Sequence, residues 1–292
     1  MPTTATAKQS GPGRTRGVER ILRGTPTSDG MGVRLTRIVG KQGLPDLDPF
    51  LMLDEFRSDD SADYIGGFPD HPHRGFETIT YMLAGRMRHS DNQGNSGVLG
   101  PGAVQWMTAG RGIVHSEMPE QQDGLMWGFQ LWLNLPAREK MTAPRYKDIG
   151  TDDMPTATPA KGVAVKIIAG RIGNAVGPVT SAATDPTYFD VTLAPGASFT
   201  HALPADYAAF AYVFEGDARI GDSATGEPLK RGEVAVLGAG EYVTVTAGDK
   251  PARVLFAAGR PLKEPIAKYG PFVMNTDAEL MQAVTDYQAG RF

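Results

Sequence analysis

The chain has 292 residues, a formal net charge of −4 and no cysteine. The absence of cysteine excludes disulfides, thiol catalysis, zinc–thiolate sites and iron–sulfur clusters, so a bound metal must be held by histidine or carboxylate ligands. The weakly acidic charge, without any block of Lys and Arg, argues against direct binding to nucleic acid.

The N-terminal stretch predicts a tail rather than a targeting signal. Residues 1–16 are small and polar, and we expect them to be disordered. They contain no apolar segment of the kind found in secretion signals, and no later run approaches the roughly 18 apolar residues of a membrane span. We therefore expect a soluble cytoplasmic protein without a membrane partner, or a nuclear one if the source is eukaryotic.

The next part of the chain has the pattern of a β-barrel. Short apolar runs such as "VRLTRIVG" (33–40), "ETITYMLAG" (77–85) and "GFQLWLNLP" (128–136) are bounded by Gly, Pro, Asn or Asp. Such runs, separated by turn residues, are typical of strands in an all-β barrel or sandwich. We assign residues 17–150 to a first domain.

The second half repeats this pattern after a boundary rich in Pro, Thr and Asp at 148–162. The run "AFAYVFEGDARI" (209–220) aligns with "TITYMLAGRMRH" (78–89), and 230–245 aligns with 100–115. The two offsets, 131 and 130 residues, are nearly equal and predict the same strand order twice. We therefore expect an all-β fold of two tandem barrels, with the second in residues 151–275.

Only the last segment, residues 276–292, predicts a helix. Thr276 and Glu279 have the spacing of a capping box, and Gly290 is placed to end the helix. Four apolar residues fall on one helical face, namely Leu280, Ala283, Val284 and Tyr287. We expect this helix to pack against one of the domains and to have no chemical role.

Two pairs of polar residues in the first half predict a metal site. His71 and His73 lie two residues apart, as do His115 and Glu117. Residues i and i+2 of a strand point to the same side, so two neighbouring strands would bring all four side chains together. Three imidazoles and a carboxylate suit a first-row transition metal with positions left open for water or substrate.

Other polar residues are weaker candidates. A His-x-His pair beside Pro and Arg can also be a solvated turn, and only the second pair makes a metal site the better interpretation. Glu77 is an alternative carboxylate, ranked behind Glu117. His89 has no partner of this spacing.

The internal repeat provides a control for the metal site. With the offsets above, the four candidate ligands correspond to positions without ligand atoms, namely Ala202, Pro204, Val245 and Ala247. His201 falls one residue out of this register and would face the other way on a strand. We expect the second barrel to lack metal ligands.

These residues lie within motifs that resemble the pirins, a two-barrel branch of the cupin superfamily. The motifs are "LDPFLMLDEF" (47–56), "HPHRGFETITYML" (71–83), "VQWMTAGRGIVHSEMP" (104–119), "FQLWLNLP" (129–136) and "EPIAKYGPFVMNT" (264–276). The resemblance implies two jelly-roll cupin barrels, with the metal in the first. It implies Fe(2+), or another divalent first-row metal, on His71, His73, His115 and Glu117.

The resemblance implies two classes of function. The first is an enzyme like quercetin 2,3-dioxygenase, in which a flavonol binds the metal and Glu117 serves as the general base for its 3-hydroxyl. The second is a metal- or redox-dependent regulator that binds a transcription factor or a metabolic enzyme. An apolar cavity above the metal would favour the enzyme, whereas a closed site beside an exposed patch would favour the regulator.

Overall fold

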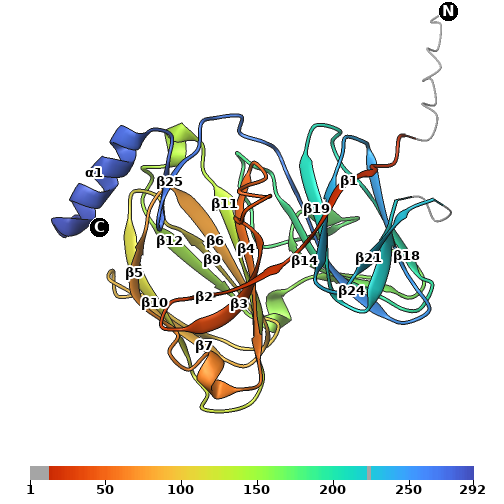
Figure 1. The fold of residues 1–292 in the computed structure, drawn as a ribbon, viewed down its shortest axis with the longest axis horizontal. Coiled ribbons are helices and arrows are strands. Elements are labelled where there is room, and N and C mark those ends of the chain that lie inside the picture. Colours follow the sequence, from red (N-terminus) through yellow and green to blue (C-terminus); the bar gives the residue numbers. More distant parts are fainter. Residues whose placement is uncertain (1–12, 222–224) are drawn as a thin grey trace, which may run out of the picture.

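The computed structural model describes residues 13–221 and 225–292. Strands dominate it, and all pairings between its named strands are antiparallel, in two barrels that lie side by side (Figure 1). Most of the predicted tail, residues 1–16, lies outside the described residues. Of its last residues, Arg16 is buried, and its backbone N–H donates to the Tyr242 carbonyl oxygen at 2.7 Å. Within the described residues, no helix has the length and hydropathy that a membrane crossing requires.

Each barrel is built from a seven-stranded and a four-stranded sheet. The large sheet of the first barrel has the order β12 (Arg145–Ile149), β9 (Val104–Thr108), β6 (Phe76–Ala84), β11 (Met126–Asn134), β4 (Phe50–Ser58), β3 (Val33–Val39) and β2 (Thr25–Asp29). Its small sheet has the order β5 (Phe68–His73), β10 (Ile113–Pro119), β7 (Met87–Asp91) and β8 (Ser96–Leu99).

The second barrel repeats this arrangement. Its large sheet has the order β1 (Val18–Arg23), β22 (Glu233–Leu237), β19 (Ala208–Glu215), β24 (Ala252–Gly259), β17 (Thr187–Leu193), β14 (Val163–Ala169) and β13 (Thr156–Ala157). Its small sheet has the order β18 (Ser198–Ala202), β23 (Tyr242–Ala247), β20 (Asp217–Ile220) and β21 (Glu227–Lys230). Two short hairpins, β15–β16 (Arg171–Ile172, Ala175–Val176) and β25–β26 (Ala267–Tyr269, Phe272–Met274), complete the strands.

The register of the pairs agrees with the predicted repeat. Tyr81 of β6 lies opposite Val104 of β9, and Tyr212 of β19 lies opposite Val234 of β22. These counterparts are separated by the offsets of 131 and 130 residues. The prediction of an all-β fold with two tandem barrels and a short C-terminal helix is confirmed.

The pairing of strand β1 does not follow the predicted domain boundary at residue 150. It falls within residues 17–150, yet it pairs with β22 at the edge of the second large sheet, as Ile21 opposite Ala235 shows. The corresponding edge of the first sheet is occupied by β12. Strand β12 lies within residues 17–150 and belongs to the first barrel, so of these two edge strands only β1 pairs outside its own segment of the chain.

The two large sheets face one another through an apolar layer. Along β6, Thr80 points into the first barrel, whereas Ile79 and Tyr81 point toward the second. Phe210 and Phe214 of β19 pack into the same layer from the other side. The large sheet of the first barrel is thus buried on both faces. One face covers the second barrel, and the other carries side chains such as Thr80 that point into the first barrel.

After β24 the chain returns to the first barrel. There the hairpin β25–β26 and the helix α1 (Asp277–Gln288) lie close to β5 and β12 (Figure 1). The predicted capping box is present, because Thr276 and Glu279 each bond the other's backbone N–H. Leu280 and Ala283 are buried on the packed face of the helix, and Gly290 beyond its end has a φ of 66°.

Candidate metal centre

Pairing of β5 with β10 brings three histidines together. His71 lies directly opposite His115, and His73 lies opposite Ile113. Since directly opposed residues of an antiparallel pair point to the same side, the imidazoles meet inside the barrel. Their ligand nitrogens all lie within 4.8 Å of one another.

The nitrogens of this cluster are prepared to bind a metal. His71 Nδ1 lies 2.8 Å from the Pro69 carbonyl oxygen, which can only accept, so Nδ1 carries the proton and Nε2 is left with its lone pair. Among the described atoms, neither ring nitrogen of His73 and not Nε2 of His115 has a hydrogen-bond partner. Buried polar atoms rarely remain without a partner, so these nitrogens fit the role of metal ligands.

Burial keeps the imidazoles of His73 and His115 neutral. It lowers the pKa of His73 and of His115 well below the usual value, and the neighbouring imidazoles lower both pKa values further. A neutral imidazole is the form that donates a lone pair to a metal. The Tyr146 hydroxyl lies 3.0 Å from His115 Nδ1, which leaves Nε2 of His115 for the cluster.

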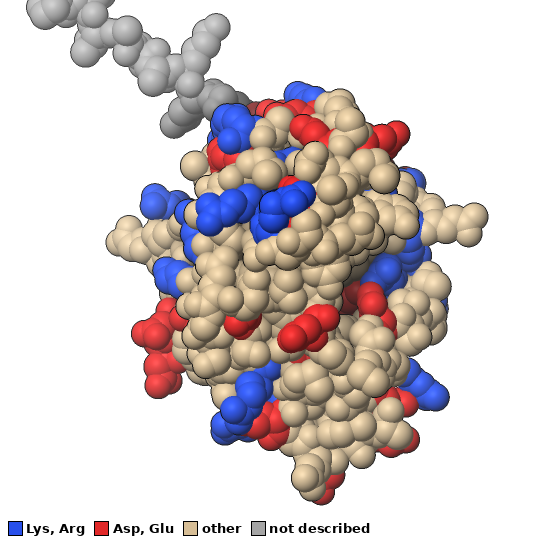
Figure 2. Space-filling view, turned by 90° about the vertical axis from the view of Figure 1, so that its left-hand side faces the viewer, with Lys and Arg blue, Asp and Glu red and all other residues tan. Residues whose placement is uncertain are grey.

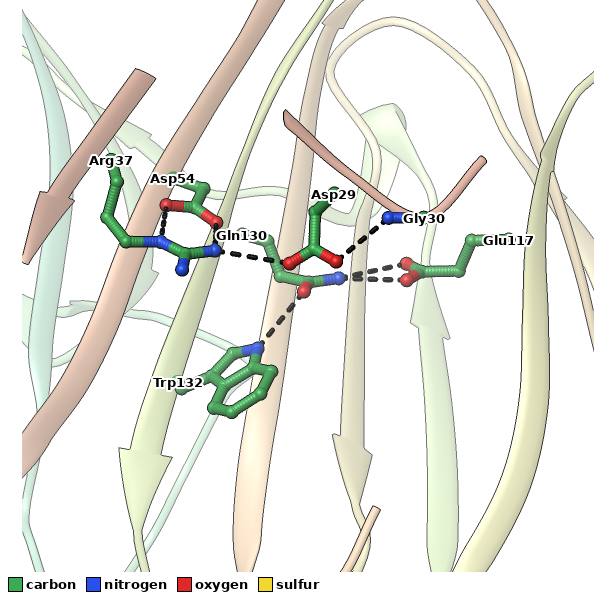
Figure 3. Close-up of polar contacts among 7 residues, drawn as sticks. All are labelled: Asp29, Gly30, Arg37, Asp54, Glu117, Gln130 and Trp132. Carbon is green, nitrogen blue, oxygen red and sulfur yellow. Dashed lines mark hydrogen bonds and ion pairs between the residues drawn. The ribbon is translucent and has the colours of Figure 1, made fainter. Parts of the chain in front are cut away.

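Glu117 lies on β10 as predicted, but its carboxylate is held by neighbours inside the barrel. Thr80 donates to its Oε1 at 3.1 Å, and the Gln130 amide donates to its Oε2 at 2.9 Å. Trp132 in turn donates to Gln130 Oε1 at 3.0 Å, which fixes the amide with its NH₂ toward Glu117 (Figure 3). Among the described residues, the close group of ligand atoms contains the three histidines without Glu117.

A cavity of about 440 Å³ opens from the histidines. His71 and His73 line it, and its apolar lining is formed by Leu51, Met52, Phe68, Pro69, Trp132 and Pro271. Its volume is within the range of about 300–1,000 Å³ usual for small-molecule sites. The cavity can therefore admit a small organic molecule to the imidazoles.

Charged side chains also line this cavity. Arg37 donates two hydrogen bonds to Asp54, at 2.9 and 2.8 Å, and one to Asp29 at 3.2 Å (Figure 3). The hydrogen bond to Asp54 raises the pKa of Arg37, whereas burial raises the pKa of Asp54. Lys268, from the returning C-terminal segment, also lines the cavity.

The structure separates Glu77 and His89 from the three histidines. Glu77 is on the opposite face of the large sheet, where its Oε1 accepts from Thr108 at 2.7 Å. His89 bonds Asp148 through Nε2 at 2.7 Å. Neither residue belongs to the close group of ligand atoms that the described part of the chain contains.

The prediction that His201 faces away from the interior of the second barrel is wrong. His201 lies opposite Val243, an interior residue, and its ring packs against Phe189 and Phe199 inside the second barrel. The register of β18 shifts because five residues connect β18 to β19, whereas two connect β5 to β6. His201 is therefore the counterpart of His73.

The other three counterparts still differ from the candidate ligands. With β18 in this register, His71, His115 and Glu117 correspond to Phe199, Val245 and Ala247. These side chains have no ligand atoms, and all three are packed in the apolar interior of the second barrel.

Sequence analysis missed the residues that orient the ligands. Gln130 and Trp132 lie in the largely apolar strand β11, and a polar residue within such a run is the signal that could have identified Gln130. Tyr146, Lys268 and Pro271 come from distant segments. Their sequence positions give no sign of proximity to the histidines.

The fold and the site define a two-barrel protein with a three-histidine cluster in the first barrel. The family model for Pirin matches residues 32–133, and that for the Pirin C-terminal cupin domain matches residues 188–292. The chain belongs to the pirin family.

Individual relatives are similar to this chain over most of its length. A pirin-like protein of Caulobacter vibrioides is 53% identical over 95% of this chain and 99% of its own length. The pirin of Homo sapiens is 42% identical over 89% of this chain and 88% of its own length. The crystal structure of a quercetin 2,3-dioxygenase from Acinetobacter baumannii is 32% identical with a TM-score of 0.87, covering 96% of this chain and 99% of that one.

Proposed function

We propose that this chain is a dioxygenase that cleaves flavonols, with Fe(II) held by His71, His73, His115 and Glu117. The observation that carries the proposal is the set of imidazole nitrogens without a hydrogen-bond partner among the described residues, beside a largely apolar cavity of about 440 Å³. The similarity to a quercetin 2,3-dioxygenase structure supports the substrate class. When bound, the iron would supply a Lewis acid for the flavonol oxygens and a redox centre for O₂.

The side chains of the cavity and of the barrel interior beside it have separate tasks in this proposal. Trp132 and Phe68 offer aromatic surface for a planar substrate. Glu117 takes the proton of the substrate's 3-hydroxyl, as a general base within the barrel. Gln130 and Thr80 hold the carboxylate of Glu117 in position, because both donate hydrogen bonds to its oxygens.

The charge distribution fits a small-molecule partner better than nucleic acid. On the face seen in Figure 2, Lys and Arg alternate with Asp and Glu around broad uncharged areas. A surface of this kind has no continuous basic stripe to follow a phosphate backbone.

The test is a turnover assay on protein purified without oxygen and reconstituted with Fe(II). We expect quercetin to disappear with release of CO. His73→Ala should lose both bound iron and CO release, because one of three clustered imidazoles is removed. His201→Ala, a histidine substitution in the other barrel, should keep both. Iron-loaded protein that releases no CO would contradict the proposal and favour the regulatory alternative.

A further inference from the structure

The part of the metal pocket that strands β2 and β3 contribute carries two opposite charges side by side. Asp29 of β2 and Arg37 of β3 both line the cavity that His71 and His73 line as well. The Asp29 side chain is 58% exposed and the Arg37 side chain is 24% exposed, so a molecule in the cavity can contact both. We call Asp29 and Arg37 the charged pair.

The charged pair has hydrogen-bonding capacity that the described part of the protein does not use. Asp29 accepts one hydrogen bond at each carboxylate oxygen, from the Gly30 N–H at 2.8 Å and from Arg37 Nη2 at 3.2 Å. Each of these oxygens can accept a second bond. Among the described residues, Arg37 donates through Nε and Nη2 but not through Nη1. A hydroxyl group can therefore donate to Asp29 and accept from Arg37 at the same time.

The charges around the pair favour a neutral donor over an anion. Asp54 is 4% exposed and accepts two hydrogen bonds from Arg37, which fixes the direction of the guanidinium (Figure 3). Asp29, Arg37 and Asp54 together therefore carry a net negative charge. Lys268, which also lines the cavity, donates to the Pro45 carbonyl oxygen at 2.6 Å and so is already engaged.

The charged pair lies two strands away from a residue that contacts a candidate ligand. Gln130, which donates to Glu117, is directly opposite Asp54, and Asp54 is directly opposite Arg37. Since neighbouring strands are about 4.8 Å apart, the backbones of Gln130 and Arg37 are separated by roughly 10 Å. A flat molecule with a bicyclic ring system and a further ring can span this separation while its other end binds the metal.

We propose that Asp29 and Arg37 determine which flavonols the metal pocket prefers, by recognising a 4′-hydroxyl group on the ring that points away from the metal. This hydroxyl donates to Asp29 and accepts from Arg37 Nη1. The inference rests on the proposed function. It adds a preference that the metal ligands cannot supply, because all flavonols have the same 3-hydroxyl and 4-keto oxygens to offer the metal.

The test is calorimetric titration of the full-length protein, loaded with Fe(II) and kept free of O₂ so that flavonols bind without being consumed. The probes are kaempferol, galangin, which lacks the 4′-hydroxyl, and kaempferide, whose methylated 4′-oxygen cannot donate. None of them has the adjacent hydroxyls through which quercetin can bind a metal in the reverse orientation. We expect kaempferol to bind about tenfold more tightly than the other two, which lack the hydrogen bond to a carboxylate.

Variants assign this preference to the charged pair. Asp29→Ala should lower the affinity for kaempferol by about tenfold, to that for galangin, without loss of iron. Asp123→Ala, which changes an exposed acidic residue in another loop, should keep the preference. Equal binding of the three flavonols by the unmodified protein, or an unchanged preference in Asp29→Ala, would overturn this inference alone. If the iron-loaded protein bound none of them, the proposed function would be overturned as well.

Discussion

Gln130 lies between Trp132 and Glu117 inside the first barrel and fixes the direction of the carboxylate (Figure 3). Trp132 donates to the Gln130 oxygen, which favours the orientation of the amide with its NH₂ group toward Glu117. Residues that orient metal ligands typically contribute about 10–100-fold to metal affinity. Gln130 therefore matters for the centre although it is not one of the candidate ligands.

We predict that Gln130→Leu lowers the affinity for Fe(II) by about 10–100-fold, because Glu117 loses its main donor. Metal competition titrations under anaerobic conditions measure this change. Gln93→Leu, in an exposed turn, serves as the control and should bind iron normally. If Gln130→Leu bound iron as tightly as the unmodified protein, Glu117 would not depend on this amide.

His201 is expected to make stability depend on pH. Burial lowers its pKa from 6.5 to about 4. In the unfolded chain, His201 is protonated as the pH falls below 6.5. In the folded chain, it is protonated only as the pH falls below about 4. The stability present above pH 6.5 is thus lost as the pH falls through this window, by roughly 3 kcal/mol for a pKa difference near 2.5.

We predict that His201→Leu flattens this dependence in urea unfolding of the metal-free protein. The free energy of unfolding should fall less between pH 6.5 and pH 4.5 than in the unmodified protein. Phe129→Leu, a substitution in the buried core of the first barrel, should lower stability by about the same amount at every pH. Parallel curves for His201→Leu and the unmodified protein would mean that the imidazole is protonated in the folded state.

At the scale of elements, the C-terminal helix α1 is held on the first barrel by one arginine. Arg74, next to His73, donates to Asp286 of α1 at 2.7 Å and to the Arg111 carbonyl oxygen at 2.6 Å. Its guanidinium also lies 4.4 Å from the centre of the Phe292 ring. The hydrogen bond from Arg74 is the main cause that lowers the pKa of Asp286.

We predict that Arg74→Ala raises the amide exchange rate of residues 277–288 by about tenfold, because α1 loses its contacts to the barrel. Hydrogen–deuterium exchange with peptide resolution measures it. Arg291→Ala removes the more exposed partner of Asp286 and should have a smaller effect. Unchanged exchange in Arg74→Ala would show that apolar contacts around Leu280 and Phe272 suffice to hold the helix.

For the whole molecule, we propose that the two barrels unfold as one unit. The apolar layer between the large sheets contains residues of both, and β1 connects the N-terminal end of the chain to the second barrel. The divisions at residues 17–150, 151–275 and 276–292 then mark segments of the chain rather than parts that are stable alone.

Phe214 tests this proposal, because it belongs to the second barrel and contacts the first. It is fully buried, with its ring 5.8 Å from Trp127 and 5.2 Å from Phe129. Phe214→Ala should cost about 3–5 kcal/mol. Because all three tryptophans lie in the first barrel, their fluorescence in urea should show a lower midpoint. A fluorescence midpoint that stays constant while circular dichroism reports early unfolding would show two independent units.

Much of the fold could be predicted from the sequence because strands, turns and the helix cap depend on local patterns. The alternation of apolar residues and the spacing of Gly216 from Gly85 are visible without coordinates. The spacing of His71 and His73 likewise placed two imidazoles on one side of a strand. The family resemblance added the identity of the metal, which remains a proposal.

The sequence by itself determined the β-strand pattern, the repeat, the helix cap and the two pairs of candidate ligands, since each depends on residues close together in the chain. The tertiary structure alone decided which distant residues meet them. Strand pairing directs the His201 side chain into the interior of the second barrel, places Gln130 beside Glu117 and places Tyr146 against His115. These contacts depend on loop lengths and on the packing of sheets, which side-chain periodicity does not encode.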